Sequence, residues 1–287
     1  MYCPMNCPNC CELQRQSEII WQDSRDAIAF GYPLYEETIS QTISLRLNRN
    51  LNSLTRVKKA PNESKNGADW LWFIYDSNSG LYLKFAVQAK RLDSNNLYGA
   101  VKMKQINDIR NFSKRKGFIP IYLFFNHNWD GFTPPSFLTA FIFQGIPAAL
   151  GATYIHADHF ANLTGSWMRK QSLSSLDQQA ISRIIKQNSQ PWFKLLCRCP
   201  GQSSLGESIV ESIYRRILAF EEGFEFDEKS GDVEPKEASD IIRNWFRGEN
   251  VSSTDLWSAF ELSDWESRYF NPDFAMIQDV RIGKSDE

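Results

Sequence analysis

The sequence predicts an α/β fold in which helices flank a mixed central sheet. Three observations predict it: an apolar residue every fourth position in one segment, a hairpin of apolar strands, and a second helix followed by a buried strand. An apolar residue recurs every four positions at Ile39, Ile43 and Leu47, which predicts a helix over 35–51. The resulting order of helix, strand, strand, helix, strand is typical of an α/β core.

The hairpin comes directly after this helix and a polar loop over 56–66. Its two apolar runs, 70–75 and 81–87, are joined by the turn-forming segment 76–80, which contains Asp, Asn, Ser and Gly. Alternating aromatic and β-branched residues on both sides of such a segment predict a β-hairpin.

The rest of the chain continues this pattern and then becomes helical. We expect a helix over 101–116 that ends at Gly117, a buried strand over 118–125, and a further strand over 152–155. The remaining segments with helical spacing are 174–187, 203–222, 235–247 and 252–262. The predicted organisation is a Cys-rich N-terminal segment (1–30), an α/β core (31–170) and a helical C-terminal region (171–287).

Composition and charge favour a protein with a packed core and exclude a strongly basic protein. The 287 residues are 42% hydrophobic, which suits a packed core, and the net charge of −2 excludes a polycation that coats nucleic acid. The segment 84–116 nevertheless holds nine basic and two acidic residues. This local excess favours a polyanionic substrate, and we expect Arg91, Lys102 and Lys104 to bind it.

No segment predicts secretion or a membrane span. The first residues lack a basic stretch followed by an apolar one. The longest apolar stretch, 137–155, is interrupted by Gln144 and Pro147 and is typical of a buried core. We therefore expect a cytoplasmic protein.

Four cysteines have spacings that suit a structural zinc ion. Cys7 and Cys10 are separated by two residues, so both thiolates could reach one tetrahedral ion, and Cys197 and Cys199 could complete it. The alternative is a reduced N-terminal segment and two buried thiols. Which four of the six cysteines would bind zinc stays open.

Polar residues at the ends of the hairpin strands form the candidate catalytic site. Asp69 precedes the first strand, and Gln88 and Lys90 end the second, where they point to the same face because strand side chains alternate. Glu36 shares the inward face of Ile39 and Ile43 on the first helix. Glu37 lies about 100° around that helix and stays an alternative.

This set of residues resembles the PD-(D/E)XK phosphodiesterase superfamily. Val87-Gln88-Ala89-Lys90-Arg91 is similar to the strand end of Mrr-like restriction endonucleases, and Gly67-Ala68-Asp69-Trp70 with Gln88-Ala89-Lys90-Arg91-Leu92 resembles a bacterial family marked by these two motifs. The resemblance spans residues 35–160. It implies a restriction-endonuclease-like fold and cleavage of nucleic acid that depends on Mg²⁺ or Mn²⁺.

The resemblance also implies roles for single residues. Asp69 would be the bridging metal ligand, Gln88 would replace the more common Glu, and the Ala89 carbonyl would be a further ligand. Lys90 would position the attacking water, and Glu36 or Glu37 would be an outer ligand. Gln105 resembles a polar residue near the substrate. The neutral Gln88 should weaken metal binding.

The predicted function is therefore a Mg²⁺-dependent endonuclease, with DNA as the expected substrate and a role in restriction or antiviral defence against phage. The helical C-terminal region would clamp substrate, mediate homo-oligomer formation or bind an activating partner protein. The alternative is a catalytically silent module with the same fold that binds nucleic acid or a protein.

Overall fold

The computed structural model describes residues 8–32, 34–51, 55–59, 66–99, 101–128, 147–168, 174–196, 209–221 and 234–260. In this part of the chain one mixed sheet has the strand order β1-β2-β3-β4-β5-β6, and β7 pairs with β3. The strands are β1 (Thr55–Lys59), β2 (Trp70–Asp76), β3 (Leu81–Arg91), β4 (Ile119–Phe125), β5 (Ala152–His156), β6 (Gln190–Pro191) and β7 (Lys236–Glu237). Only the β3–β4 pair is parallel among these strands. The α/β fold with a mixed sheet is confirmed.

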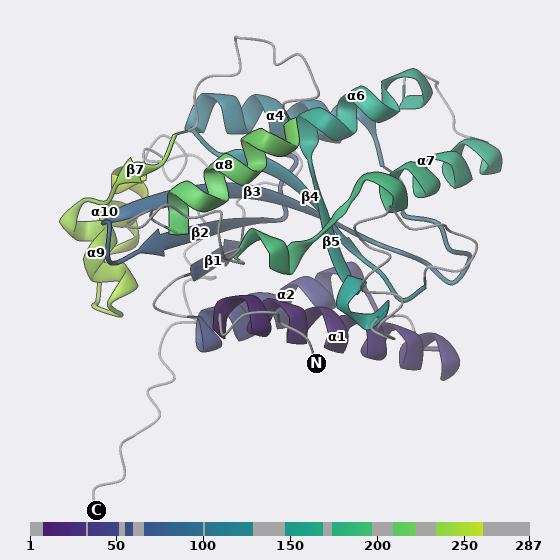
Figure 1. Cartoon of the computed structure of the whole chain (residues 1–287), viewed down its shortest axis with the longest axis horizontal. Helices are drawn as coiled ribbons and strands as arrows, with labels where there is room; N and C mark the ends of the chain where they lie inside the picture. Colours follow the sequence, from purple (N-terminus) through teal and green to yellow (C-terminus); the bar gives the residue numbers. More distant parts are fainter. Residues whose placement is uncertain are drawn as a thin grey trace, which may run out of the picture.

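Helices cover both faces of the sheet, with α1 and α2 below it and α4 and α6 above it in Figure 1. The described helices are α1 (Pro8–Ala29), α2 (Glu36–Asn50), α4 (Met103–Lys116), α6 (Ala157–Met168), α7 (Ser175–Asn188), α8 (Ile209–Glu221), α9 (Asp240–Phe246) and α10 (Ser253–Ala259). Two short 3₁₀ helices, η1 (Pro147–Leu150) and η2 (Trp192–Leu195), flank β5 and β6.

The alternation of side chains along β3 divides the interior into two cores. Phe85 and Val87 belong to the first core, together with residues of α1, α2 and α8. Tyr82 and Ala86 belong to the second core, together with residues of α4, α6, α9 and α10. Gln88 is in phase with Ala86, so it lies on the second face of the sheet.

The elements with the strongest local patterns form as predicted. The hairpin pairs β2 and β3 antiparallel from Trp70↔Val87 to Asp76↔Leu81. Helix α4 ends at Lys116 and is capped by Gly117, whose φ of 65° is left-handed and therefore favours glycine. The predicted helix over 35–51 is α2, and the predicted strands over 118–125 and 152–155 are β4 and β5.

Helix α1 was not predicted, because half of its buried face is polar. Leu13 and Ile20 pack in the first core, but Gln16 and Ser17 are buried beside them. The sequence of α1 therefore lacks the complete helical repeat of apolar residues that would predict this helix. A Cβ built on Gly151 would lie 1.9 Å from the Ser17 carbonyl oxygen, so α1 packs directly on this glycine.

Strand β1 lies in a segment predicted to be a polar loop. Its residues 55–59 pair with β2, and Asn48 of α2 binds both backbone groups of Val57. The Asn48 Nδ2 atom donates to the Val57 carbonyl at 3.0 Å, and the Val57 N–H donates to Asn48 Oδ1 at 2.7 Å. The segment is basic in sequence, so its strand character depends on these tertiary contacts.

The C-terminal helices also differ in part from the prediction. The segment 235–247 forms β7 and then α9, because Lys236 and Glu237 pair with the start of β3 and Ser239 caps the helix that follows. Helix α8 covers the described part of the predicted helix over 203–222, and α10 that of 252–262. The predicted boundaries after residues 30 and 170 stay predictions, and helices from all three segments contribute to the two cores.

None of the described helices is long and apolar enough to span a bilayer.

Candidate functional site

Asp69 is brought to the end of β3 by the antiparallel pairing of the hairpin. Its N–H donates to the Val87 carbonyl at 2.8 Å, so it continues the ladder one residue beyond Trp70. The preceding turn is fixed by Gly67, which has a φ of 70°, and by the Asn66 side chain, which accepts from the Ala68 N–H at 2.7 Å. Asp69 therefore lies beside Gln88, as the sequence predicts.

The Asp69 carboxylate accepts two hydrogen bonds from the end of β3. Gln88 Nε2 donates to Asp69 Oδ2 at 2.7 Å, and the Ala89 N–H donates to the same oxygen at 2.6 Å. Gln88 Nε2 also donates to the Ala89 carbonyl at 3.1 Å. Three of the predicted metal ligands thus form one connected cluster.

Gln105 joins this cluster from α4. Its Nε2 donates to Gln88 Oε1 at 2.6 Å, so all polar atoms of the Gln88 amide are hydrogen-bonded. Gln88 is fully buried, and an amide in such a position needs these partners because water cannot replace them. The sequence predicts Gln105 near the substrate, and the structure places it directly behind Gln88.

Lys90 lies next along β3 and contacts α2. Its Nζ is 3.3 Å from Glu36 Oε1, and the Arg91 N–H donates to Glu36 Oε2 at 3.1 Å. Glu36 is in the first turn of α2, where the helix dipole favours a carboxylate. Glu37 is exposed and bonds to Gln41, so the structure brings Glu36 to the cluster and leaves Glu37 outside it.

The donor atoms of the cluster suit a hard divalent cation. The Asp69 carboxylate, the Ala89 carbonyl and the Gln88 amide oxygen are ligands of the kind that Mg²⁺ prefers, and Mg²⁺ retains waters that reduce the number of protein ligands it needs. Within the described residues no group of three or more His, Cys, Asp or Glu side chains could hold a metal ion. A metal site built from the described residues would therefore use at most two such side chains together with neutral oxygens.

Tyr122 is a residue of this site that the sequence analysis did not identify. It pairs with Gln88 across the parallel β3–β4 ladder and so lies on the same face. Its hydroxyl is buried without a hydrogen-bond partner among the described residues. Burial raises the pKa of Tyr122, and the negative charges of Asp69, Asp108 and Glu36 raise it further. The sequence indicated only that Tyr122 lies in a buried strand, which does not mark it as a residue of the site.

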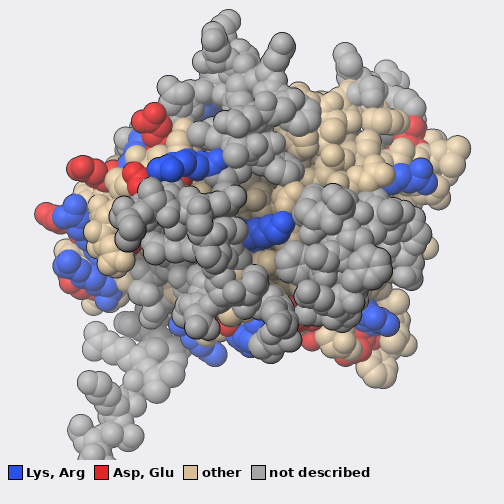
Figure 2. Space-filling model, in the orientation of Figure 1, with Lys and Arg blue, Asp and Glu red and all other residues tan. Residues whose placement is uncertain are grey.

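Only part of the basic charge of the segment 84–116 is exposed and unneutralised by a neighbouring carboxylate. Lys84 is buried, Lys90 pairs with Glu36, and Arg110 pairs with Asp158 of α6. Lys104 is exposed but pairs with Asp108 at 2.6 Å, while Lys102 is exposed at the start of α4. On the face in Figure 2, basic and acidic residues are interspersed over the described surface.

The zinc hypothesis falls largely outside the described residues. Cys7, Cys197 and Cys199 are not among them. Cys10 lies in α1 and is 1% exposed. The zinc site stays a prediction.

The comparison with known families covers almost the whole chain. A family of unknown function (DUF6615) matches residues 9–277. The chain belongs to this family. The matched segment of the chain includes α1 from its second residue, the sheet and every predicted site residue from Glu36 to Gln105, but not Cys7. No curated protein matches the chain.

Proposed function

We propose that this chain is a Mg²⁺- or Mn²⁺-dependent endonuclease of the PD-(D/E)XK superfamily, with a restriction-endonuclease-like core similar to that of Mrr-like enzymes. The observation that carries the proposal is the hydrogen-bonded cluster of Asp69, Gln88 and Ala89 where β2 begins and β3 ends, with Lys90 next along β3. Hard oxygen donors beside a lysine suit the hydrolysis of a phosphodiester, because the reaction needs a site for charge and a positioned water.

Each residue has a distinct role in this proposal. Asp69, the Ala89 carbonyl and Gln88 would hold the metal ion, which when bound lowers the pKa of water and neutralises charge on the phosphate. Lys90 offers three N–H donors to the attacking water or to a phosphate oxygen. Glu36 orients the Lys90 ammonium, since its Oε1 lies 3.3 Å from Lys90 Nζ.

We propose DNA in the cytoplasm as the substrate and defence against phage as the role, by analogy with the resembling enzymes. Arg91, Lys102 and Lys104 would contact the phosphate backbone, and their charges would make binding dependent on salt. An oligomer or an activating partner protein would regulate cleavage.

A catalytically silent module is the second candidate function, and the Gln88 amide favours it. Its nitrogen donates to two atoms that a metal ion would otherwise use, Asp69 Oδ2 and the Ala89 carbonyl oxygen. Because Gln88 is neutral, it also adds no second negative charge beside Asp69, which accepts from the Gln88 amide and the Ala89 N–H. Such a module would bind nucleic acid or a protein without cutting.

Cleavage assays decide between the two. The wild type would be incubated with plasmid DNA, linear DNA and RNA in the presence of Mg²⁺, Mn²⁺ or EDTA. We expect cleavage that requires the metal and that falls about 100-fold or more in Asp69→Asn and in Lys90→Met, because each change removes a group that stabilises the transition state.

Two controls make the assay specific. Asp240→Asn removes a carboxylate that is 92% exposed on α9, and Lys114→Met removes an exposed lysine of α4; both should cut like the wild type. Circular dichroism and thermal unfolding would show that the site variants are folded. Binding of nucleic acid without cleavage under every condition would favour the silent module instead.

A further inference from the structure

The hydrogen bonds around Gln88 determine which way its amide faces. Asp69 Oδ2 and the Ala89 carbonyl oxygen accept hydrogen bonds and cannot donate them, so the atom of Gln88 that faces them must be the nitrogen. On the other side, Gln88 Oε1 accepts from Gln105 Nε2 at 2.6 Å. The orientation is therefore a consequence of its partners.

This orientation is opposite to the one that a cation requires. A metal ion held by Asp69 and the Ala89 carbonyl would face the Gln88 N–H donors and would be repelled by them, whereas the amide oxygen would be a ligand. The Gln88 amide nitrogen thus occupies the position in the hydrogen-bond network that a cation would take, because both are electropositive partners for the same two oxygens.

Gln105 is suited to accompany a reversal of this amide. When Gln88 turns its oxygen toward Asp69, its nitrogen turns toward α4, where it needs an acceptor. The Gln105 side chain carries both a donor and an acceptor at its end, so its own reversal would supply the amide oxygen. Residues that only donate or only accept could not serve both orientations.

We propose that Gln88 and Gln105 form a coupled amide pair that reverses when a divalent cation binds at Asp69, and that Gln105 is the positioning residue of this pair. The inference rests on the proposed metal site. The inference extends that proposal, because metal binding would then depend on a residue of α4 that does not itself touch the metal. A second carboxylate would attract the cation directly. The uncharged Gln88 and Gln105 would instead accommodate it by turning their amide groups.

The first test uses the wild-type chain and the metal alone. The protein would be labelled with ¹⁵N-glutamine, and the side-chain amide signals of Gln88 and Gln105 would be assigned with the variants Gln88→Met and Gln105→Met. We expect both pairs of amide signals to shift together as Mg²⁺ is added, with the same midpoint. Mg²⁺ binding, measured by calorimetry, that leaves either amide unmoved would overturn the coupled pair.

Variants at position 105 test the direction of the effect. Gln105→Glu can only accept, so it should hold the Gln88 oxygen toward Asp69 and lower the Kd for Mg²⁺ about tenfold. Its Gln88 amide signals should lie near the metal-bound positions before Mg²⁺ is added. Gln105→Lys can only donate, so it should hold the nitrogen toward Asp69 and raise the Kd by a similar factor.

A matched control separates this effect from charge alone. Asn107→Glu and Asn107→Lys place the same charges on the exposed side of α4, and we expect them to change the Kd less than about twofold, because exposed charges are screened. Equal changes in the Kd for Mg²⁺ from substitutions at positions 105 and 107 would overturn the proposal that Gln88 and Gln105 reverse together. The two failures are distinguishable: Mg²⁺ binding without amide reversal overturns this inference alone, whereas no binding of Mg²⁺ or Mn²⁺ also overturns the metal-dependent nuclease.

Discussion

Gly67 is the residue on which the position of Asp69 depends most directly. Its φ of 70° lies in the left-handed region, and a Cβ built on it would lie 2.6 Å from the Gln105 carbonyl oxygen and 2.8 Å from the Ile109 nitrogen. The backbone of the turn before β2 therefore packs against the backbone of α4. A side chain here would separate Asp69 and Gln88 on the sheet from Gln105 on the helix.

Gly67→Ala should destabilise the fold by about 3 kcal/mol or more, because it combines backbone strain with a steric clash. Gly31→Ala is the matched control: its φ is 72°, but a Cβ there has no neighbour within 4 Å. We expect this control to cost about 1 kcal/mol, the strain alone. Urea unfolding of both variants measures the difference, and equal losses would contradict the proposed close packing.

At the scale of elements, Lys84 links β3 to the ends of two helices. Its side chain is 2% exposed, and its Nζ donates to the carbonyl of Lys116, the last residue of α4, at 2.8 Å. It also donates to the Phe260 carbonyl after α10 at 3.2 Å and lies 4.9 Å from the centre of the Phe118 ring. A lysine counted as basic charge in the sequence thus satisfies carbonyls at helix C-termini.

Lys84→Met should lower the free energy of unfolding by about 1–3 kcal/mol, because methionine fills the space but leaves buried carbonyl oxygens without their donor. Thermal or urea unfolding measures this loss. Lys114→Met, at an exposed position of α4, should change stability by less than about 0.5 kcal/mol. If both variants unfolded like the wild type, the contacts of Lys84 would not contribute to stability.

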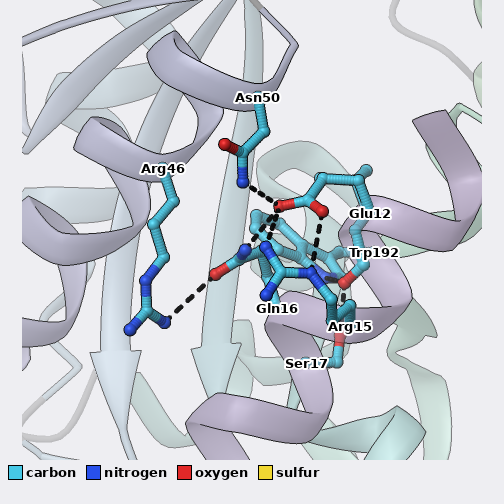
Figure 3. A network of polar contacts seen from close by, with 8 residues as sticks. Glu12, Arg15, Gln16, Ser17, Arg46, Asn50 and Trp192 are labelled. Carbon is cyan, nitrogen blue, oxygen red and sulfur yellow. Dashed lines mark hydrogen bonds and ion pairs between the residues drawn. The ribbon is translucent and has the colours of Figure 1, made fainter. Parts of the chain in front are cut away.

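At the scale of the whole molecule, a polar network attaches α1 to α2 and to η2, which follows β6 (Figure 3). Glu12 accepts from Arg15, Gln16 and, across to α2, Asn50 at 2.7 Å. Arg46 of α2 donates to Gln16 at 3.2 Å, and Trp192 donates to the Leu13 carbonyl at 2.8 Å. The network explains how a helix with a half-polar buried face is held in the fold.

This network makes stability depend on pH. Burial alone would raise the pKa of Glu12, but hydrogen bonds from Arg15, Asn50 and Gln16 outweigh it and hold the pKa below its ordinary value of 4.5. A carboxyl whose pKa is lowered by folding stabilises the fold above its unfolded pKa, and this contribution is lost as the pH falls through the folded pKa. Glu12 therefore contributes stability at neutral pH that disappears in acid.

Glu12→Gln should lower the free energy of unfolding by about 1–2 kcal/mol at pH 7, because hydrogen bonds to a charged acceptor are lost. The difference from the wild type should shrink as the pH falls below 4.5 toward 3. Urea unfolding at several pH values measures it, with Asp240→Asn as an exposed control that should show little difference at any pH. A difference that stays constant from pH 7 to pH 3 would contradict this role of Glu12.

Local patterns in the sequence were sufficient for the elements that carry the site. The apolar repeat of α2, the alternation in β2 and β3 and the glycine after α4 depend on residues close together in the chain, so they are readable without the fold. The same alternation places Gln88 and Lys90 on one face. Helix α1 and strand β1 could not be predicted from the sequence, because polar residues occupy half of the buried face of α1 and much of β1, and the partners of both elements lie elsewhere in the chain.

The sequence by itself therefore determined the fold class, the hairpin and the types of residue at its ends. Only the tertiary structure decided that Glu36, and not Glu37, contacts Lys90 across 54 positions of the chain, and that Gln105 binds Gln88 across 17. It also placed Tyr122 opposite Gln88 through the parallel β3–β4 pair. The physical reason is that periodicity specifies which face a side chain occupies, whereas its partners depend on how distant elements pack.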